Sequence, residues 1–156
     1  HFGKAIKSLD RKGFRTKLEE IKGKIPILGI CLGSQILLEK SEEAPAEKGL
    51  GFIQGQTVCL PINESPRTGW YKTNLISNKL NGKNKYLNRF NSFYYYNHSF
   101  VQKISDNQKV MTLISNNYCA GYFDNDLIVG LQFHPEKSQK AGKIALKSIL
   151  KFFSLL

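Results

Sequence analysis

Apolar residues near the start of the chain recur three to five positions apart, at Phe2, Ile6, Leu9, Phe14, Leu18 and Ile21. This spacing predicts one or two amphipathic helices across residues 2–22, divided at Gly13. An uninterrupted apolar run at residues 27–30 is typical of a buried parallel strand, and residues 36–38 are expected to lie in the first turns of a helix. The pattern therefore predicts a strand, a tight turn and a helix around residues 31–35.

The pattern changes after residue 41, where glycines and prolines separate short runs of β type. Residues 41–92 are expected to form loops and hairpins, with β structure at residues 56–60. Four further strands are predicted, at residues 93–101, 110–115, 119–123 and 127–133. Asn125 and Asp126 are expected to form the turn that joins the last two strands.

A final helix is predicted over residues 138–153. The apolar side chains expected to face the core are Ile144, Leu146, Ile149, Leu150 and Phe153.

Composition narrows the class of protein. The chain has 156 residues, 41% of them hydrophobic, which suits a single globular domain spanning residues 1–156. No stretch reaches the ~18 uncharged apolar residues that cross a bilayer, and the first residues lack the layout of a secretory signal. We therefore expect a soluble, cytoplasmic protein without a membrane role. The three cysteines, Cys31, Cys59 and Cys119, are widely spaced, which favours reduced thiols and no metal site.

The formal net charge of +11 raises the question of polyanion binding. The lysines are scattered between apolar residues, which indicates the solvated faces of amphipathic helices and argues against a nucleic-acid site. An acidic partner surface or a phosphorylated substrate remains an alternative use of this charge.

Cys31 is the candidate nucleophile. Gly29 and Gly33 flank it with the spacing of a nucleophile elbow, a sharp strand-to-helix turn that presents the central side chain. Glycines suit such a turn because Cβ atoms would collide with the adjoining backbone, and the helix N-terminus favours a thiolate. The N–H of Leu32 is expected to face the oxyanion that forms when Cys31 attacks an amide carbonyl. The alternative is a buried cysteine between two glycines that pack a helix.

His134 and Glu136 follow an apolar strand and stand two positions apart. In extended backbone such residues face the same side, so Glu136 can orient His134 while the other ring nitrogen addresses the cysteine sulfur. A lone histidine at a strand end is usually a surface residue, but its combination with an elbow cysteine favours a catalytic role.

Residues 29–35 and 132–138 resemble the two signature motifs of class I, triad-type glutamine amidotransferases. Together with residues 26–43, 49–55, 69–70 and 97–99, they make nearly the whole chain similar to the glutaminase subunit of imidazole glycerol phosphate synthase. The resemblance implies a flavodoxin-like α/β fold with a mixed sheet flanked by helices. It also implies that Cys31 is the nucleophile, that His134 acts as general base and then acid, and that Glu136 orients His134. No cofactor or metal is expected.

The resemblance further implies that Gln35 and the backbone around His98 and Ser99 hold the glutamine substrate. Gln35 lies one helical turn after Cys31, which returns it to the same face. The alternatives are an exposed helix position for Gln35 and a purely structural strand role for His98 and Ser99. Trp70 resembles a residue that the family places near the contact with its synthase partner, and a core position is the alternative.

The sequence departs from the family pattern in two places. The family's second oxyanion donor comes from a glycine-rich loop that precedes the position of His1, so that donor and the opening strands of the sheet are expected to be missing. Only Gly3 is a candidate remnant of that loop. Arg67 and Thr68 stand where histidine and methionine usually precede the glycine and tryptophan, which leaves the identity of the partner open.

The main hypothesis is a glutaminase that forms a heterodimer with a barrel synthase, a cyclase, and supplies it with ammonia for imidazole glycerol phosphate formation in histidine biosynthesis. One alternative is ammonia supply to a sugar amidotransferase in surface-polysaccharide biosynthesis. A second is a non-catalytic remnant that only binds the synthase, and a third is a γ-glutamyl peptidase that acts without a partner.

Overall fold

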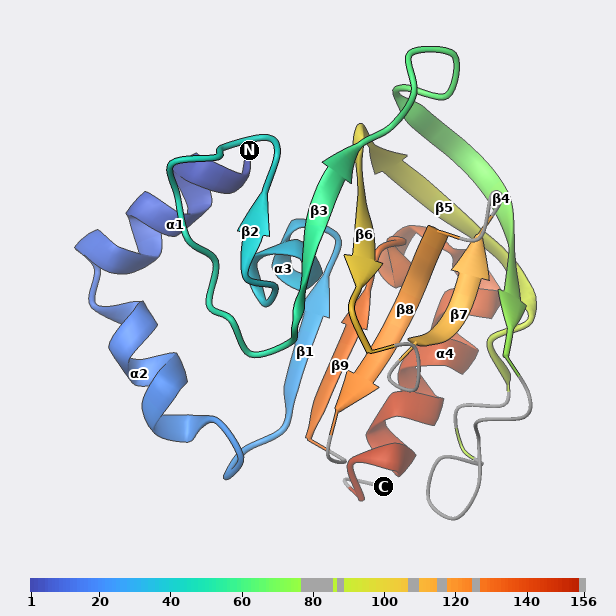
Figure 1. The fold of residues 1–156 in the computed structure, drawn as a ribbon. Helices are drawn as coiled ribbons and strands as arrows, with labels where there is room; N and C mark the ends of the chain where they lie inside the picture. The colour runs from blue at the N-terminus through green and yellow to red at the C-terminus, as the bar shows by residue number, and fades with distance from the viewer. Residues whose placement is uncertain (77–85, 87–88, 107–109, 115–117, 125–126, 155–156) are drawn as a thin grey trace.

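The structure is a computed structural model and describes residues 1–76, 86, 89–106, 110–114, 118–124 and 127–154. Within these residues a nine-stranded sheet carries helices on its two sides (Figure 1). The helices are α1 (Phe2–Arg11), α2 (Phe14–Ile21), α3 (Leu32–Ile36), the 3-10 turn η5 (Pro135–Lys137) and α4 (Gln139–Phe152). The strands are β1 (Ile27–Ile30), β2 (Lys40–Ser41), β3 (Gly55–Cys59), β4 (Arg67–Leu75), β5 (Ser92–His98), β6 (Phe100–Ile104), β7 (Val110–Ile114), β8 (Tyr118–Asp124) and β9 (Ile128–Leu131).

The sheet is mixed, as the resemblance implied. Its strands follow the order β2-β3-β6-β8-β7-β4-β5, and β9 pairs with β8 and with β1. The β1–β9 pair is parallel and places Ile30 opposite Leu131. Both strands therefore end at the same edge of the sheet, and the residues that follow them, Cys31 and Gln132, begin there side by side.

Helix α4 packs on one face of the sheet through Ala145, Ile149 and Phe152, which lie in one buried cluster with residues of β5, β7, β8 and β9. The prediction of a helix here is confirmed, but its inward face differs from the expected one. Leu150 is 39% exposed, and Phe152 rather than Phe153 is fully buried. The buried stripe is thus rotated toward small residues that allow close approach to the sheet.

Helices α1 and α2 are divided at Gly13, as predicted, and Gly13 adopts the left-handed conformation with φ +71°. Their packing is unequal. α1 buries Phe2 and Ile6, whereas α2 has no buried residue and leaves Phe14 52% exposed. The apolar spacing of α2 therefore predicted a buried face that this helix does not have.

Helix α3 has five residues and ends at Ile36, before the predicted helical positions Leu37 and Leu38. The reason lies in the chain segment that follows. The carbonyl of Ile36 accepts a hydrogen bond from Leu50 N, and that of Leu37 accepts from Phe52 N and Ile53 N. These long-range partners replace the next turn of the helix.

The predicted strands at residues 119–123 and 127–133 correspond to β8 and β9, and residues 56–60 largely correspond to β3. The single strand expected at residues 93–101 is two strands, β5 and β6, separated by a bend at Ser99. β4 was missed because Pro66 and Gly69 indicated a loop, yet it pairs with β5 along Arg67–Thr73. Ser115 and the expected turn at Asn125 and Asp126 lie outside the described residues.

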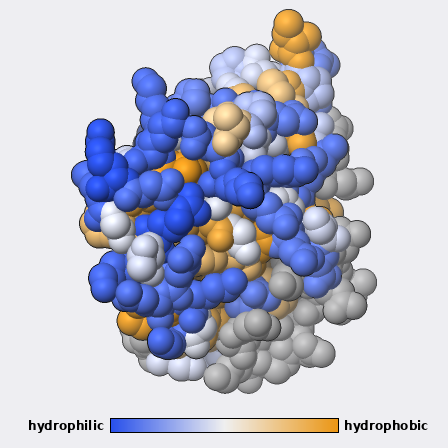
Figure 2. All heavy atoms as spheres, turned by 60° about the vertical axis from the view of Figure 1, so that its left-hand side comes forward, coloured by the Kyte–Doolittle hydropathy of each residue, from blue (hydrophilic) through white to orange (hydrophobic). Residues whose placement is uncertain are grey.

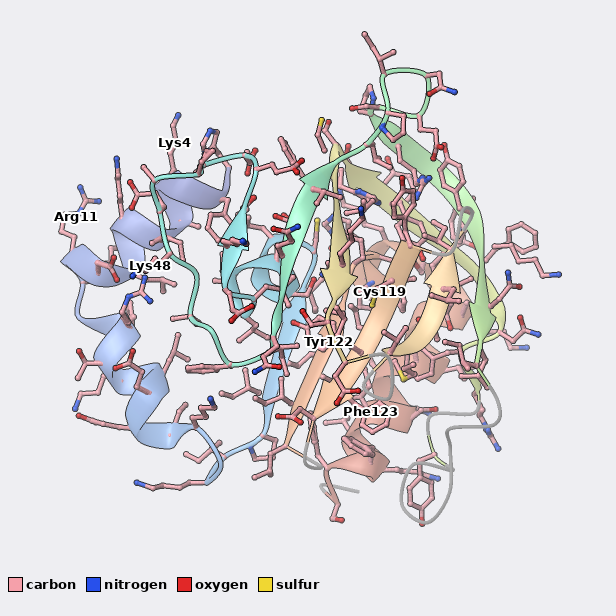
Figure 3. The ribbon with its side chains drawn as sticks, viewed as in Figure 1. Lys4, Arg11, Lys48, Cys119, Tyr122 and Phe123 are labelled. Atoms are coloured by element: carbon pink, nitrogen blue, oxygen red, sulfur yellow. The ribbon has the colours of Figure 1, made fainter. Side chains whose placement is uncertain are left out.

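The basic side chains of the first two helices face outward. Lys4 and Arg11 of α1, together with Lys48 from the segment between β2 and β3, are exposed and point away from the sheet (Figure 3). Figure 2 shows this side of the molecule to be predominantly hydrophilic. Lys7 pairs with Glu47 and Lys17 with Glu20, which is typical of solvated helix faces. Across the described part of the chain, none of the helices is long and apolar enough to span a bilayer.

Candidate active site

Cys31 stands at the turn between β1 and α3 with φ +49°, a conformation that is costly for a residue with a Cβ. Gly29 makes the turn possible, since a Cβ there would lie 2.8 Å from the backbone of Gly33. The expected collision at Gly33 itself is wrong, because a Cβ at Gly33 would meet nothing within 4 Å. Only the first glycine is therefore required by packing in this structure.

Buried polar side chains hold the strained turn from below. Ser34 Oγ donates to the carbonyl of Cys31 at 2.7 Å, and Gln102 Nε2 donates to Ser34 Oγ. Tyr122 OH donates to the carbonyl of Ser34 at 2.7 Å. To reach it, Tyr122 crosses β9 at Gly130, where a Cβ would lie 2.1 Å from the tyrosine ring. The turn is thereby fixed to β6 and β8.

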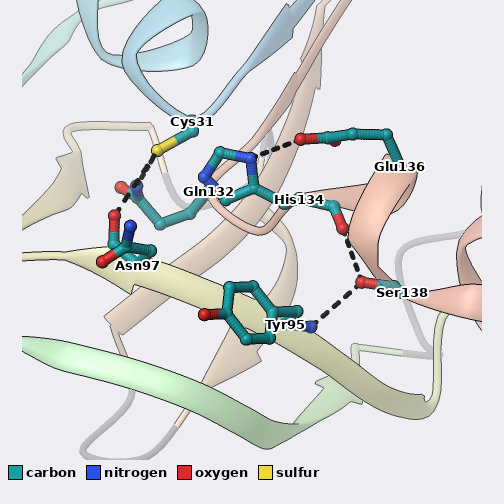
Figure 4. A network of polar contacts seen from close by, with 7 residues as sticks. All are labelled: Cys31, Tyr95, Asn97, Gln132, His134, Glu136 and Ser138. Carbon is teal, nitrogen blue, oxygen red and sulfur yellow. Dashed lines mark hydrogen bonds and ion pairs between the residues drawn. The ribbon is translucent and has the colours of Figure 1, made fainter.

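His134 and Glu136 form a close pair. His134 Nδ1 lies 2.6 Å from Glu136 Oε1, and the imidazole lies between this carboxylate and Cys31 (Figure 4). The structure makes the contact in a different way from the expected extended strand. His134 is extended, but Glu136 belongs to the 3-10 turn η5, which folds the carboxylate back toward the ring.

The backbone of His134 is fixed on both sides. Its N–H donates to the carbonyl of Tyr95 at 2.8 Å, and its carbonyl accepts from Ser138 Oγ at 2.6 Å. Ser138 Oγ also accepts from Tyr95 N at 3.0 Å, which ties η5 to β5 (Figure 4). The histidine is therefore held by the strand next to it and not only by its own turn.

Burial raises the pKa of the Cys31 thiol above its ordinary value, and the negative charge of Glu136 adds to the rise. The backbone N–H of Leu32 and the charge of Lys137 act in the opposite direction. The sulfur lies 4.0 Å from the carbonyl of Asn97, which can only accept the S–H proton. The resting group is thus a thiol, and its activation requires a base such as His134.

A cavity of about 290 Å³ opens beside Cys31. Its walls contain all four predicted substrate-binding residues, Leu32, Gln35, His98 and Ser99. Asn97, Pro66, Phe100, Glu43 and His1 also line it. The volume is just below the roughly 300–1,000 Å³ of drug-sized small-molecule sites, which suits a ligand of amino-acid size.

Gln35 is 5% exposed, so the alternative of an exposed helix position is wrong. Its Nε2 donates to the carbonyl of Phe100 at 3.0 Å and to Gln132 Oε1 at 3.1 Å. An amide nitrogen has two hydrogens, and both are used here. Only the carbonyl oxygen of Gln35 is therefore left to interact with a ligand.

His98 is 8% exposed and lies opposite Arg67 in the β4–β5 ladder. Its Nδ1 faces the carbonyl of Phe100 at 2.9 Å and must be the protonated nitrogen of the neutral ring. Burial and the charge of Arg67 lower the pKa of His98 to about 4. Arg67 is 2% exposed and paired with Glu64, so this half of the departure from the family pattern lies in the interior, whereas Thr68 is exposed.

The lowered pKa of His98 predicts that stability falls in mild acid. Between pH 7 and 5 the unfolded state takes up a proton at an ordinary histidine while folded His98 stays neutral. Folding should lose up to about 2 kcal/mol over this range from His98 alone. Urea unfolding at both pH values should show a smaller difference for His98→Gln than for wild type, whereas exposed His1→Gln should keep the wild-type difference.

Trp70 lies on the surface, with 46% of its area exposed, which excludes the core alternative. Its ring meets the ring of Tyr95 on β5 edge to face, with centroids 6.2 Å apart. Phe93, which also lies on β5, is 56% exposed. Lys137 Nζ lies 5.5 Å from the centre of the Tyr95 ring. Trp70, Phe93 and Tyr95 form an aromatic face next to the turn that carries Glu136.

The structure adds residues that the sequence reasoning did not single out. The backbone of Asn97 and the side chain of Gln132 contact the sulfur, and Glu43 lines the cavity. The position of Gln132 next to the His-Pro-Glu run was a signal in the sequence. Gly3 lies within α1, where a Cβ would be 2.9 Å from Ala44 Cβ, so it serves helix packing and not an oxyanion loop.

Comparison with known sequences gives a family match over most of the chain. The model of the family described as glutamine amidotransferase class-I matches residues 7–151. Imidazole glycerol phosphate synthase subunit HisH of Methanopyrus kandleri is 33% identical, over 96% of this chain and 74% of the relative. Subunit HisH 2 of Vibrio vulnificus is 36% identical, over 99% of this chain and 73% of the relative.

Solved structures share the fold. One glutamine amidotransferase superposes with a TM-score of 0.66 at 11% identity, over 95% of this chain and 72% of its own. A glutamine amidotransferase of Thermotoga maritima superposes with a TM-score of 0.56 at 24% identity, and the match covers 93% of this chain and 57% of the Thermotoga chain.

Proposed function

The chain belongs to the class-I glutamine amidotransferase family, and from this membership we propose that Cys31, His134 and Glu136 hydrolyse L-glutamine to glutamate and ammonia. One observation carries the assignment of residues: the imidazole of the 2.6 Å His134–Glu136 pair lies between Glu136 and the elbow cysteine (Figure 4), and this cysteine lines a cavity of amino-acid size. A purely structural cysteine would need neither the strained turn nor the histidine next to it.

The chemistry follows from the arrangement. His134 takes the S–H proton through Nε2, and the sulfur attacks the side-chain carbonyl of glutamine. The oxygen that becomes negative is stabilised by the N–H of Leu32. The imidazolium, oriented by Glu136, gives its proton to the leaving nitrogen, and ammonia departs. His134 then activates a water that hydrolyses the thioester to glutamate and restores the thiol.

The walls of the cavity suit the remaining groups of glutamine. Gln35 offers only its carbonyl oxygen, an acceptor for an N–H of the substrate. Glu43 also lines the cavity, and although one of its carboxylate oxygens accepts from Phe2 N, its negative charge complements the α-ammonium group. His98 and Ser99 form the wall at the bend between β5 and β6.

The ammonia is passed to a barrel synthase, a cyclase, in the formation of imidazole glycerol phosphate, with which the chain forms a heterodimer. This proposal is supported by the relatives named as subunits of that synthase. The aromatic face suits docking, because tryptophan and tyrosine are typical anchors of protein interfaces. It lies beside the active site, so a partner bound there can receive ammonia without its release to solvent.

Little hydrolysis is expected without the partner, since activation on docking limits wasteful ammonia release. The experiment measures glutamate release from glutamine by the chain alone and with the cyclase and its ligand. Release that depends on the cyclase supports the proposal. Release without any partner, from γ-glutamyl peptides in preference to glutamine, would favour a peptidase, and no release in any pairing would overturn the glutaminase assignment.

Replacing Trp70 by alanine should weaken cyclase binding by at least about 10-fold, because truncation of an interface anchor costs ~2 kcal/mol. Binding is measured by titration calorimetry with the purified cyclase. Phe14→Ala, which removes an aromatic ring 52% exposed on α2, is the matched control and should leave the affinity unchanged. Equal affinities for the wild type and Trp70→Ala would place the docking surface elsewhere.

A further inference from the structure

The side chain of Gln35 has a defined orientation. The atom that it turns toward the main chain of β6 faces the carbonyl of Phe100 at 3.0 Å. A carbonyl only accepts, so this atom must be the amide nitrogen, and its second hydrogen points to the side chain of Gln132. The partner atom of Gln132, at 3.1 Å, must then be its oxygen Oε1.

The orientation of Gln132 follows from that of Gln35. With its oxygen engaged, Gln132 presents Nε2 to the sulfur of Cys31, at 4.0 Å (Figure 4). Gln132 is fully buried and Gln35 is 5% exposed. If the Gln132 amide were flipped, its nitrogen would face the nitrogen of Gln35, which pairs two donors, and its oxygen would face the sulfur, which pairs two acceptors. Burial makes such unsatisfied contacts costly, so the observed direction is strongly preferred.

The main chain places Gln132 where this contact is possible. Gln132 directly follows β9, whose parallel partner β1 ends one residue before Cys31. Its N–H donates to the carbonyl of Ala120 at 2.9 Å, which fixes the end of β9 to β8. The contact therefore joins two rigid strand ends and does not depend on a loop.

We propose that Gln132 stabilises the Cys31 thiolate by donating a side-chain N–H to the sulfur, and that Gln35 is a positioning residue that fixes the direction of this donor. The proposal deepens the proposed function, because it rests on Cys31 as the nucleophile. Besides the N–H of Leu32, two groups contact the sulfur at 4.0 Å with opposite effects. The Asn97 carbonyl favours the protonated thiol, whereas the Gln132 amide favours the anion.

The test measures the rate of Cys31 alkylation by iodoacetamide as a function of pH, read from the Cys31 peptide by mass spectrometry. No glutamine or partner is needed, so the outcome is independent of whether glutaminase activity is found. Gln132→Met keeps the length of the side chain without the donor. Its alkylation midpoint should rise by about one pH unit, with ~10-fold slower reaction at neutral pH.

Gln132→Glu should raise the midpoint further than Gln132→Met, because a carboxylate repels the thiolate. Gln35→Met leaves Gln132 in place but frees its amide to turn, so a smaller rise is expected. In the double variant Gln35→Met/Gln132→Met the midpoint should equal that of Gln132→Met alone, since Gln35 acts only through Gln132.

Gln102→Met is the matched control, because Gln102 is a buried glutamine below the same turn that bonds Ser34 and not the sulfur. It should leave the alkylation midpoint unchanged. An unchanged midpoint in Gln132→Met, or an equal rise in Gln102→Met, would overturn the proposal. Thermal unfolding of each variant identifies any that fails to fold, and Gln35→Met then supplies the deciding measurement.

Discussion

Replacing Cys31 by alanine should lower cyclase-stimulated glutamate release by at least ~10⁴-fold, because no other group can form the thioester. The strained backbone at residue 31, with φ +49°, is unfavourable for alanine as well, so the turn keeps its conformation only if the bonds to Ser34 hold it. The measurement is single-turnover glutamate release with excess enzyme. It separates loss of chemistry from loss of substrate binding.

Cys59 provides the control for this substitution. It is exposed at the end of β3, and Cys59→Ala should retain wild-type hydrolysis. A glutamine-like electrophile should label Cys31 and leave Cys59 and the buried Cys119 unmodified. Hydrolysis that survives in Cys31→Ala would remove Cys31 from the mechanism. Failure to label Cys31 with the cyclase present would favour the non-catalytic binding role.

Much of the candidate site was predictable because its chemistry lies in two short motifs. The glycine before Cys31 indicates an elbow, and the apolar runs before Cys31 and Gln132 indicate buried strands. The parallel pairing of β1 with β9 is what brings the two motifs together. A class-I glutamine amidotransferase fold was therefore accessible from the residues and their resemblance to the family.

The unpredicted parts depend on contacts between segments far apart in the sequence. α3 ends early because residues 50–53 take its carbonyls, and nothing near residue 36 indicates this. β4 begins directly after Pro66 and continues through Gly69 because β5 pairs with it along Arg67–Thr73. The backbone carbonyl of Asn97 reaches the sulfur across 66 positions, and no side-chain pattern reports a main-chain contact of that kind.

Some expectations remain predictions. The assignment of residues 1–156 to one domain is among them, as are the roles of the predicted site residues and the heterodimer with a cyclase.

Arg67 shows that a difference from the family sequence can be interpreted only once the position of the residue in the structure is known. As a surface residue it would have altered the docking face, but its guanidinium lies inside, over the rings of Tyr71 and Tyr118.

The other large effect is expected for Gly142→Ala, which should lower the free energy of unfolding by about 3 kcal/mol or more. A Cβ at Gly142 would lie 1.8 Å from the carbonyl oxygen of Pro135, so α4 and η5 must separate. The intrinsic gain of about 1 kcal/mol for alanine in a helix is too small to offset this backbone clash. Because η5 carries Glu136, glutamate release should also fall in protein that remains folded.

Gly33→Ala is the matched control for this steric argument. It makes the same change within a helix, but its Cβ would meet nothing within 4 Å, so the stability of the protein should be unchanged or slightly higher. Chemical denaturation of the wild type and both variants measures the two differences under one set of conditions. If Gly142→Ala is as stable as Gly33→Ala, α4 can move from η5 at no cost, and the close packing of that helix does not hold the His134–Glu136 pair in place.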